Sequence, residues 1–257
     1  MTQFVSAKDG VRLAWESAGE GAPVVLIHGF ASSREQNWRS TGWIDRLVRE
    51  GFRVVSFDCR GHGLSDKPHE PEAYGPRMVD DIVSVMEAAK LPKADLIGYS
   101  MGAILSVGLL MEHPERVRRA VLAGLGSSYF KPSDPVRHPI AEALLVEDFE
   151  SIADPVARRF RAFTSQKGKD RVALAACMRS ARRKYTPEDL RRVTQPVLVV
   201  CGENDDITGP PGPLAEAFAN GRALVLAGKD HMSAVGDPAA KRAVVEFLRE
   251  NGLSSSP

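Results

Sequence analysis

The chain has 257 residues, of which 43% are hydrophobic, enough for one large domain with a full hydrophobic core. Its formal net charge is +1, so the overall charge gives no argument for a nucleic-acid partner. No apolar run approaches the roughly 20 residues that a membrane-spanning helix needs, and the first residues lack the features of a signal peptide. We expect a cytoplasmic protein without membrane or nucleic-acid partners, either a monomer or a homodimer.

The three cysteines, Cys59, Cys177 and Cys201, are widely spaced along the chain. Their number is odd, and their spacing matches none of the patterns typical of metal sites. We therefore expect reduced thiols, as is usual inside cells.

Alternating polar and apolar residues at 3–7 and 11–18 flank Asp9-Gly10, a pair typical of a hairpin turn. Strand-like and helix-like patterns then alternate along the chain. We expect strands at 23–27, 53–57, 94–99, 117–123, 196–201 and 223–226, and helices at 34–49, 76–90, 101–112 and 237–250. This alternation predicts an α/β fold, with a mostly parallel central sheet flanked by helices and an N-terminal antiparallel hairpin.

Residues 127–192 interrupt the alternation, because they contain helical patterns and no clear strand. We expect them to form a small helical cap, inserted into a core domain made of residues 1–126 and 193–257. This segment holds 14 Lys and Arg residues against 9 Asp and Glu residues. Two interpretations of that excess stay open: an ordinary solvated helical face, or a basic rim that favours acidic substrates.

Residues 98–102 read Gly-Tyr-Ser-Met-Gly and lie between a strand-like and a helix-like apolar run. A serine on such a strand-to-helix turn, a nucleophile elbow, has a strained backbone and an exposed hydroxyl. The flanking glycines suit a turn in which a Cβ would clash. Alternatively, Ser100 only caps the following helix. The apolar runs on both sides favour the nucleophile.

A serine nucleophile needs a base within hydrogen-bond reach, and the base needs a carboxylate to orient it. In an open α/β sheet, such groups gather beyond the carboxyl ends of the strands. Of the 6 histidines, His231 has the expected place, between the last strand and the last helix. His28 and His62 lie in glycine-containing loops, which we expect them to shape.

The candidate acids follow the strand that ends near Gly202, in the sequence Gly-Glu-Asn-Asp-Asp. Asp205 and Asp206 both qualify as the group that orients His231. Either one could instead be a carboxylate that stabilises the following turn. With either acid, the chain order is Ser, Asp, His, which is the order of α/β-hydrolases.

Acyl transfer also needs two backbone N–H groups that bind the developing oxyanion. Met101 offers one, because it begins a helix whose dipole favours negative charge. Phe30 is the candidate for the second, in the loop after the strand at 23–27, where Gly29 permits a tight backbone. The Phe30 ring could also form a wall of the acyl pocket.

Several motifs in order resemble those of the α/β-hydrolase superfamily, in particular its small carboxylesterase-like members with an inserted cap. The motifs are His28-Gly29-Phe30, the stretch 57–66 (FDCRGHGLSD), Gly98–Gly102, Gly202–Asp205, and His231 before Asp237-Pro238. The resemblance covers the whole chain except residues 127–192. The family pattern places the acid three residues after the strand-end glycine, which selects Asp205 over Asp206.

The resemblance implies a serine hydrolase that cleaves small to medium carboxylic esters, including lactones, through an acyl-enzyme intermediate. Its catalytic triad would be Ser100, Asp205 and His231, with Phe30 and Met101 forming the oxyanion hole. Such an enzyme requires no metal or organic cofactor, and its partner is a small-molecule ester. A serine at the elbow excludes the haloalkane dehalogenase and epoxide hydrolase branches, which use a carboxylate nucleophile.

Three alternatives stay open within the same superfamily. One is C–C bond hydrolysis of dienoic keto acids, which are anionic substrates. Another is a perhydrolase or haloperoxidase activity. The non-enzymatic alternative is a ligand receptor that keeps the fold.

Overall fold

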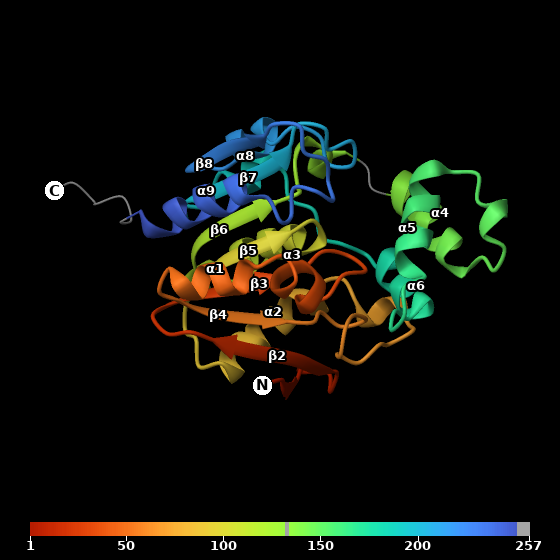
Figure 1. The fold of residues 1–257 in the computed structure, drawn as a ribbon, viewed down its shortest axis with the longest axis horizontal. Helices are drawn as coiled ribbons and strands as arrows, with labels where there is room; N and C mark the ends of the chain where they lie inside the picture. The colour runs from red at the N-terminus through yellow and green to blue at the C-terminus, as the bar shows by residue number, and fades with distance from the viewer. Residues whose placement is uncertain (132–133, 251–257) are drawn as a thin grey trace.

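The computed structural model describes residues 1–131 and 134–250 of the chain. Its central layer is one 8-stranded sheet with the order β1-β2-β4-β3-β5-β6-β7-β8 (Figure 1). The strands are β1 (Gln3–Ser6), β2 (Arg12–Ala18), β3 (Ala22–Ile27), β4 (Phe52–Phe57), β5 (Ala94–Tyr99), β6 (Val117–Ala123), β7 (Val197–Gly202) and β8 (Gly221–Leu226). Strand β2 pairs antiparallel with β1 and β4, and the remaining pairs are parallel. The predicted fold class is confirmed.

Helices cover both faces of the sheet, and the apolar side chains form a separate cluster on each face. Strand β3 shows the division, because Val25 and Ile27 belong to one cluster while Val24 and Leu26 belong to the other. A strand buried on both faces reads as a continuous apolar run, as this one does. The flanking helices are α1 (Trp43–Arg49), α2 (Arg77–Ala88), α3 (Met101–Glu112), α8 (Gly212–Ala217) and α9 (Pro238–Arg249).

The prediction of one helix over 34–49 is wrong. A π-helical turn covers Glu35–Arg39, turn residues follow, and α1 begins only at Trp43. Gly42, just before α1, has a left-handed backbone with φ 75°, and the Thr41 hydroxyl donates a hydrogen bond to a backbone carbonyl one turn earlier. The periodic pattern also did not reveal the short helix α8 or the 3-10 turn at Pro71–Ala73.

Residues 127–192, which we name the cap segment, contain helices and no strand in their described part. Their elements are 3-10 turns at Ser127–Phe130 and Phe149–Ser151 and the helices α4 (Asp134–Leu145), α5 (Pro155–Thr164), α6 (Arg171–Arg179) and α7 (Pro187–Leu190). In Figure 1, α4, α5 and α6 stand together beyond the end of the sheet to which β6 points. The division into core and cap domains stays a prediction, and its ranges include 132–133 and 251–257, which lie outside the described residues.

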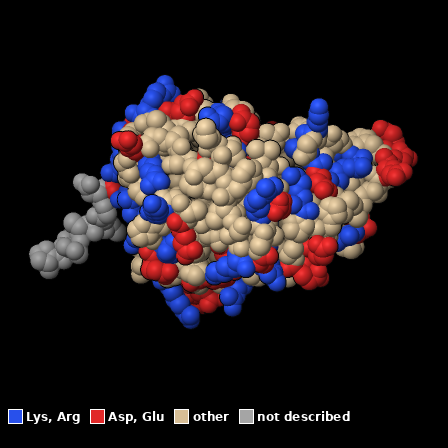
Figure 2. All heavy atoms as spheres, turned by 90° about the horizontal axis from the view of Figure 1, so that it is seen from below, with Lys and Arg blue, Asp and Glu red and all other residues tan. Residues whose placement is uncertain are grey.

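The surface carries charges of both signs. Figure 2 shows Lys and Arg side chains mixed with Asp and Glu side chains, also toward the right end where the cap segment lies. Within the described residues, no helix is long and apolar enough to cross a membrane.

Candidate active site

Ser100 lies at the sharp turn from β5 into α3. Its backbone has φ 52° and ψ −110°, a combination that non-glycine residues rarely adopt. Within the described residues its side chain makes no capping hydrogen bond to α3. Its Oγ instead lies 3.1 Å from Nε2 of His231. The hydroxyl is therefore turned toward a base rather than used to stabilise the helix.

Two glycines allow this turn. An added Cβ would lie 2.0 Å from the Ile27 carbonyl oxygen at Gly102, and 2.4 Å from the Gly102 carbonyl oxygen at Gly98. Both distances are far below van der Waals contact. Because no side chain fits at either position, the elbow can pack directly against the carboxyl end of β3.

His231 lies in the loop between β8 and α9, at the same edge of the sheet. Its Nδ1 is 2.8 Å from Oδ2 of Asp205. Since an ionised carboxylate only accepts hydrogen bonds, Nδ1 carries the proton and Nε2 is left to accept the Ser100 hydroxyl. The loop is held by the Tyr99 hydroxyl, which donates to the His231 carbonyl oxygen, and by Asp230, which accepts from two backbone amides.

Asp205 combines the two roles that its position suggests. Its Oδ1 accepts hydrogen bonds from the amides of Ile207, at 3.1 Å, and Thr208, at 3.0 Å, while Oδ2 faces His231. Burial by itself would raise the pKa of Asp205, but the hydrogen bonds to His231 and Thr208 outweigh it and lower the pKa. The carboxylate is therefore ionised at neutral pH, as a group that orients an imidazole must be.

The neighbouring Asp206 points elsewhere. Its carboxylate is 60% exposed and forms an ion pair with Arg159 of α5, at 3.0 Å. The structure thus brings Asp205, and not Asp206, into contact with His231.

The two candidate oxyanion donors flank Ser100. Met101 is the first residue of α3, so its N–H is one of those that the helix itself does not use. The loop that carries Phe30 also runs beside the serine, because a Cβ added at Gly29 would lie 3.5 Å from Ser100 Cβ. The Gly29 amide donates to the side-chain oxygen of Asn37, at 3.0 Å, which fixes the start of this loop.

His28 and His62 hold these loops in place, which confirms their predicted position in shaped loops. His28 Nδ1 lies 2.8 Å from the Gly29 carbonyl oxygen, and its Nε2 accepts from the Cys59 amide at 3.0 Å. His62 Nδ1 lies 2.9 Å from the carbonyl oxygen of Arg60. Burial lowers the pKa of both, that of His62 to about 3. Both rings are therefore neutral under ordinary conditions.

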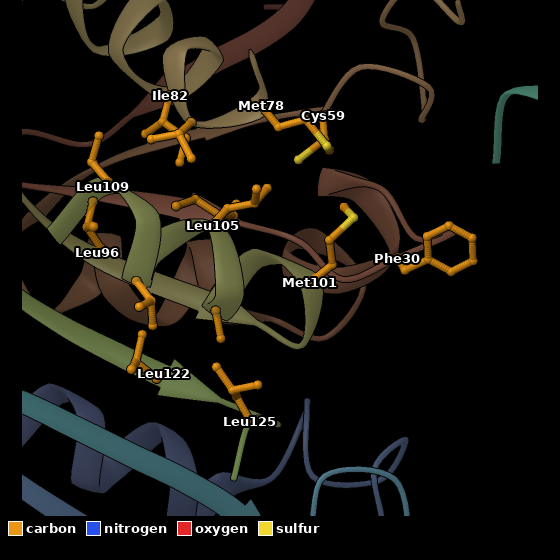
Figure 3. Packing of buried hydrophobic residues seen from close by; sticks show 14 of the residues in the cluster. Phe30, Cys59, Met78, Ile82, Leu96, Met101, Leu105, Leu109, Leu122 and Leu125 are labelled. Carbon is orange, nitrogen blue, oxygen red and sulfur yellow. The ribbon is translucent and has the colours of Figure 1, made fainter. Parts of the chain in front are cut away.

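Side chains of the cap segment approach the same place. Phe30 belongs to the buried cluster, and in Figure 3 its ring points away from the other labelled side chains. Its centroid lies 5.9 Å from that of Phe160 on α5 and 5.8 Å from that of His62. The Met101 sulfur lies 3.9 Å from the sulfur of Cys177 on α6. The side chains of both candidate oxyanion residues thus contact the cap segment.

Sequence reasoning missed Tyr99, Phe160 and Cys177 at this site. Tyr99 ends a predicted strand, and nothing in its local pattern signals a bond to a loop 132 residues away. The two cap residues lie in a segment without a recognisable motif. Within the described residues, no group of three or more His, Cys, Asp or Glu side chains is placed to hold a metal ion.

Comparison with known proteins identifies the family of this chain. A family model described as the alpha/beta hydrolase fold matches residues 22–145, and one described as TAP-like protein matches residues 164–255. A 2-hydroxy-6-oxo-6-(2'-aminophenyl)hexa-2,4-dienoic acid hydrolase of Metapseudomonas resinovorans is 30% identical over 224 residues, 80% of this chain and 75% of its own. A putative 2-succinyl-6-hydroxy-2,4-cyclohexadiene-1-carboxylate synthase of Bacillus subtilis is 29% identical, over 80% of this chain and 82% of its own.

Among solved structures, a hydrolase from Pseudomonas aeruginosa PA01 is 28% identical, with a TM-score of 0.81 over 97% of this chain and 98% of its own. The chain belongs to the α/β-hydrolase superfamily. Together these relatives support a hydrolase.

Proposed function

We propose that the chain is a serine hydrolase that cleaves small to medium carboxylic esters through an acyl-enzyme intermediate. The observation that carries this proposal is the hydrogen-bonded chain from Ser100 through His231 to Asp205, with spacings of 3.1 and 2.8 Å. A serine, a base and an orienting carboxylate in this geometry form the arrangement that activates a hydroxyl for attack.

In the first half of the reaction, Ser100 Oγ attacks the ester carbonyl carbon while His231 Nε2 takes the hydroxyl proton. Asp205 stabilises the imidazolium that results. The negative charge moves to the carbonyl oxygen, which the amides of Phe30 and Met101 would bind. Each such donor lowers the barrier by about 3 kcal/mol. The imidazolium then gives its proton to the leaving alcohol, and the acyl group stays on Ser100.

In the second half, a water molecule attacks the acyl-enzyme. His231 accepts a proton from the water, and the same two amides bind the second tetrahedral intermediate. When this intermediate collapses, the proton passes to Ser100 Oγ and the carboxylic acid leaves. Because the mechanism uses only groups of this chain and water, it calls for no cofactor.

Hydrolysis of a C–C bond is the second candidate. It is favoured by the relative from Metapseudomonas resinovorans, whose name gives a dienoic acid as its substrate. The same serine, histidine and amide donors would serve that reaction. A ligand receptor on this fold would have no need of the bonded triad, so an enzyme is the better account.

The test is hydrolysis of p-nitrophenyl acetate and butyrate, with a ring-fission product as the C–C substrate, by the parent protein and Ser100→Ala. We expect turnover of the esters and its loss in the variant, because no nucleophile remains. Ser84→Ala is the control, since the Ser84 hydroxyl donates to the Asp80 carbonyl within α2. Undiminished ester hydrolysis in a folded Ser100→Ala protein would refute the nucleophile, and turnover of the ring-fission product alone would favour the second candidate.

A further inference from the structure

Most basic side chains of the cap segment have partners that explain their place. Five of them form ion pairs: Arg158 with Glu150, Arg159 with Asp206, Arg179 with Glu142, Arg183 with Glu112, and Arg192 with Asp189. Arg161 and Arg171 donate to the Val146 carbonyl oxygen just beyond α4. Many of the Lys and Arg residues that give this segment its excess of positive charge therefore form contacts within the folded protein.

Lys169, in the loop between α5 and α6, is different. Its Nζ donates to the Phe163 carbonyl oxygen at 3.1 Å and lies 3.4 Å from the centroid of the Phe163 ring. Within the described residues, no ion pair joins its ammonium to a carboxylate, and the carboxylate of the neighbouring Asp170 pairs with His69. Burial lowers the pKa of Lys169 to about 8. This half-buried ammonium has thus lost part of its hydration without gaining an opposite charge.

The loop that carries Lys169 is fastened to the core on both sides. Gln36 donates to the side-chain oxygen of Gln166 at 2.9 Å, and His69 lies 2.9 Å from the Asp170 carboxylate. Gln36 closely follows the loop of the candidate oxyanion donor, and His69 closely follows the loop of His62. Lys169 lies between these two attachments, so its segment spans both loops.

Other interactions of the two loops also indicate that Lys169 lies near them. Burial is the main cause that lowers the pKa of His28 and His62, and the Lys169 ammonium lowers both further. The ring of His62 contacts Phe30, which contacts Phe160 on the helix that leads to Lys169. The ammonium therefore belongs to the side of the site bordered by Phe30.

We propose that Lys169 binds a carboxylate of the substrate, so that the site takes esters whose acyl part ends in a carboxylate. The reaction in this proposal rests on the proposed function, whereas the contact between Lys169 and a carboxylate does not. A substrate carboxylate would supply the counter-charge that Lys169 lacks, in a partly desolvated place where a charge-assisted hydrogen bond is strong. Lys169 is thus a specificity-determining residue. The basic rim that the charge excess suggested is then this single side chain.

The experiment compares half-esters of dicarboxylic acids with neutral esters of the same length, for example methyl hydrogen glutarate with methyl pentanoate, near neutral pH. Succinate and adipate half-esters extend the series, so that the spacing of the two groups is sampled. The variants are Lys169→Met, which keeps an apolar stem over the Phe163 ring, and Lys169→Arg, which keeps the charge. Lys167→Met is the matched control, because Lys167 is an exposed lysine of the same loop.

We expect Lys169→Met to lower the ratio of kcat/KM for the best half-ester over its neutral partner about tenfold, the usual effect of one charge-assisted hydrogen bond. Lys169→Arg should restore most of the preference, and Lys167→Met should leave it unchanged. Lys167→Met should also hydrolyse the neutral ester as well as the parent protein does. An unchanged ratio in Lys169→Met, or an equal fall in Lys167→Met, would overturn the proposal.

Glutarate binding separates this proposal from the proposed function, because it needs no turnover. Calorimetry compares Ser100→Ala with the double variant that also carries Lys169→Met. We expect about tenfold weaker binding to the double variant, again from the loss of one such bond. If the parent hydrolyses no ester but this difference appears, only the proposed reaction fails. Equal binding, or none to either protein, contradicts the role of Lys169.

Discussion

At the level of single residues, Ser100 and Asp205 each combine a local and a long-range role. The backbone carbonyl oxygen of Ser100 accepts hydrogen bonds from the first turn of α3, while its hydroxyl faces His231. Asp205 stabilises its own turn with one carboxylate oxygen and contacts the imidazole with the other. For Asp205 the two interpretations are thus compatible, because its two oxygens act separately. For Ser100 the interpretation as a side-chain cap is wrong, since among the described residues the hydroxyl makes no capping hydrogen bond.

The choice between the adjacent acids can be tested directly. We expect Asp205→Asn to lower kcat for ester hydrolysis by about 10³–10⁴-fold, because the amide no longer holds the imidazole in the productive tautomer. Asp206→Asn should change kcat by no more than about twofold, since an exposed ion pair contributes little. Steady-state kinetics on p-nitrophenyl butyrate measures both. If Asp206→Asn proves to be the inactive variant, the assignment is wrong.

Motif and strand-end position were sufficient to place Ser100 and His231. They did not decide between the two acids, because both suit the turn after β7, and only the family spacing selected Asp205. The roles of Lys169 and of the Tyr99 hydroxyl could not be predicted. Tyr99 donates to a distant loop, and the neighbours of Lys169, Gln166 and Asp170, contact loops that only the folded chain brings near.

At the level of elements, the elbow depends on the close approach of β3, β5 and α3. Ile27 ends β3, and its carbonyl oxygen lies where a side chain at Gly102 would have to be. The apolar runs made these strands and this helix predictable from the sequence. The helix predicted at 34–49 failed because Trp38 and Trp43 both pack against the sheet, with ring centroids 6.1 Å apart, and the chain between them turns at Gly42.

Gly102→Ala tests whether the close packing of α3 against β3 requires glycine. The added Cβ would lie 2.0 Å from the Ile27 carbonyl oxygen, so β3 and α3 must separate. We expect the free energy of unfolding to fall by about 3 kcal/mol, as for an overpacked core, and ester hydrolysis to fall with it. Urea denaturation measures the first effect.

Gly212→Ala is the control for that substitution. In α8 the nearest atom to an added Cβ is 4.0 Å away, a Glu216 side-chain oxygen, so nothing must move. The control should be neutral or stabilising by up to about 1 kcal/mol, because alanine favours helices. Equal stability of the two variants would show that the approach of β3 and α3 does not require glycine.

At the level of the whole molecule, the cap segment and the loops beyond the sheet meet through contacts between residues far apart in the sequence. Polar examples are the bond between Gln36 and Gln166 and the ion pair between Arg159 and Asp206. An apolar example is Phe30 against Phe160. A single sequence indicates which segments are helical, but it does not indicate which of their faces meet, so these contacts could not be predicted.

The thiols test the packing of the whole molecule. All three cysteines are free and buried, Cys177 of the cap segment included. Burial raises the pKa of each, that of Cys201 to about 11, so the reactive thiolate is scarce and shielded. We expect negligible reaction with a disulfide reagent in the native protein and three reactive thiols in concentrated guanidinium chloride. A thiol that reacts rapidly in the native protein would show that this packing opens.

The most direct test of the central claim is covalent labelling with a fluorophosphonate, which reacts with an activated serine hydroxyl. The account predicts one adduct per chain by intact mass, located on Ser100 by peptide mapping. The adduct should be absent in Ser100→Ala and form far more slowly in His231→Asn, because the hydroxyl then lacks its base. No adduct on the folded parent protein, or an adduct on a serine other than Ser100, would contradict the account.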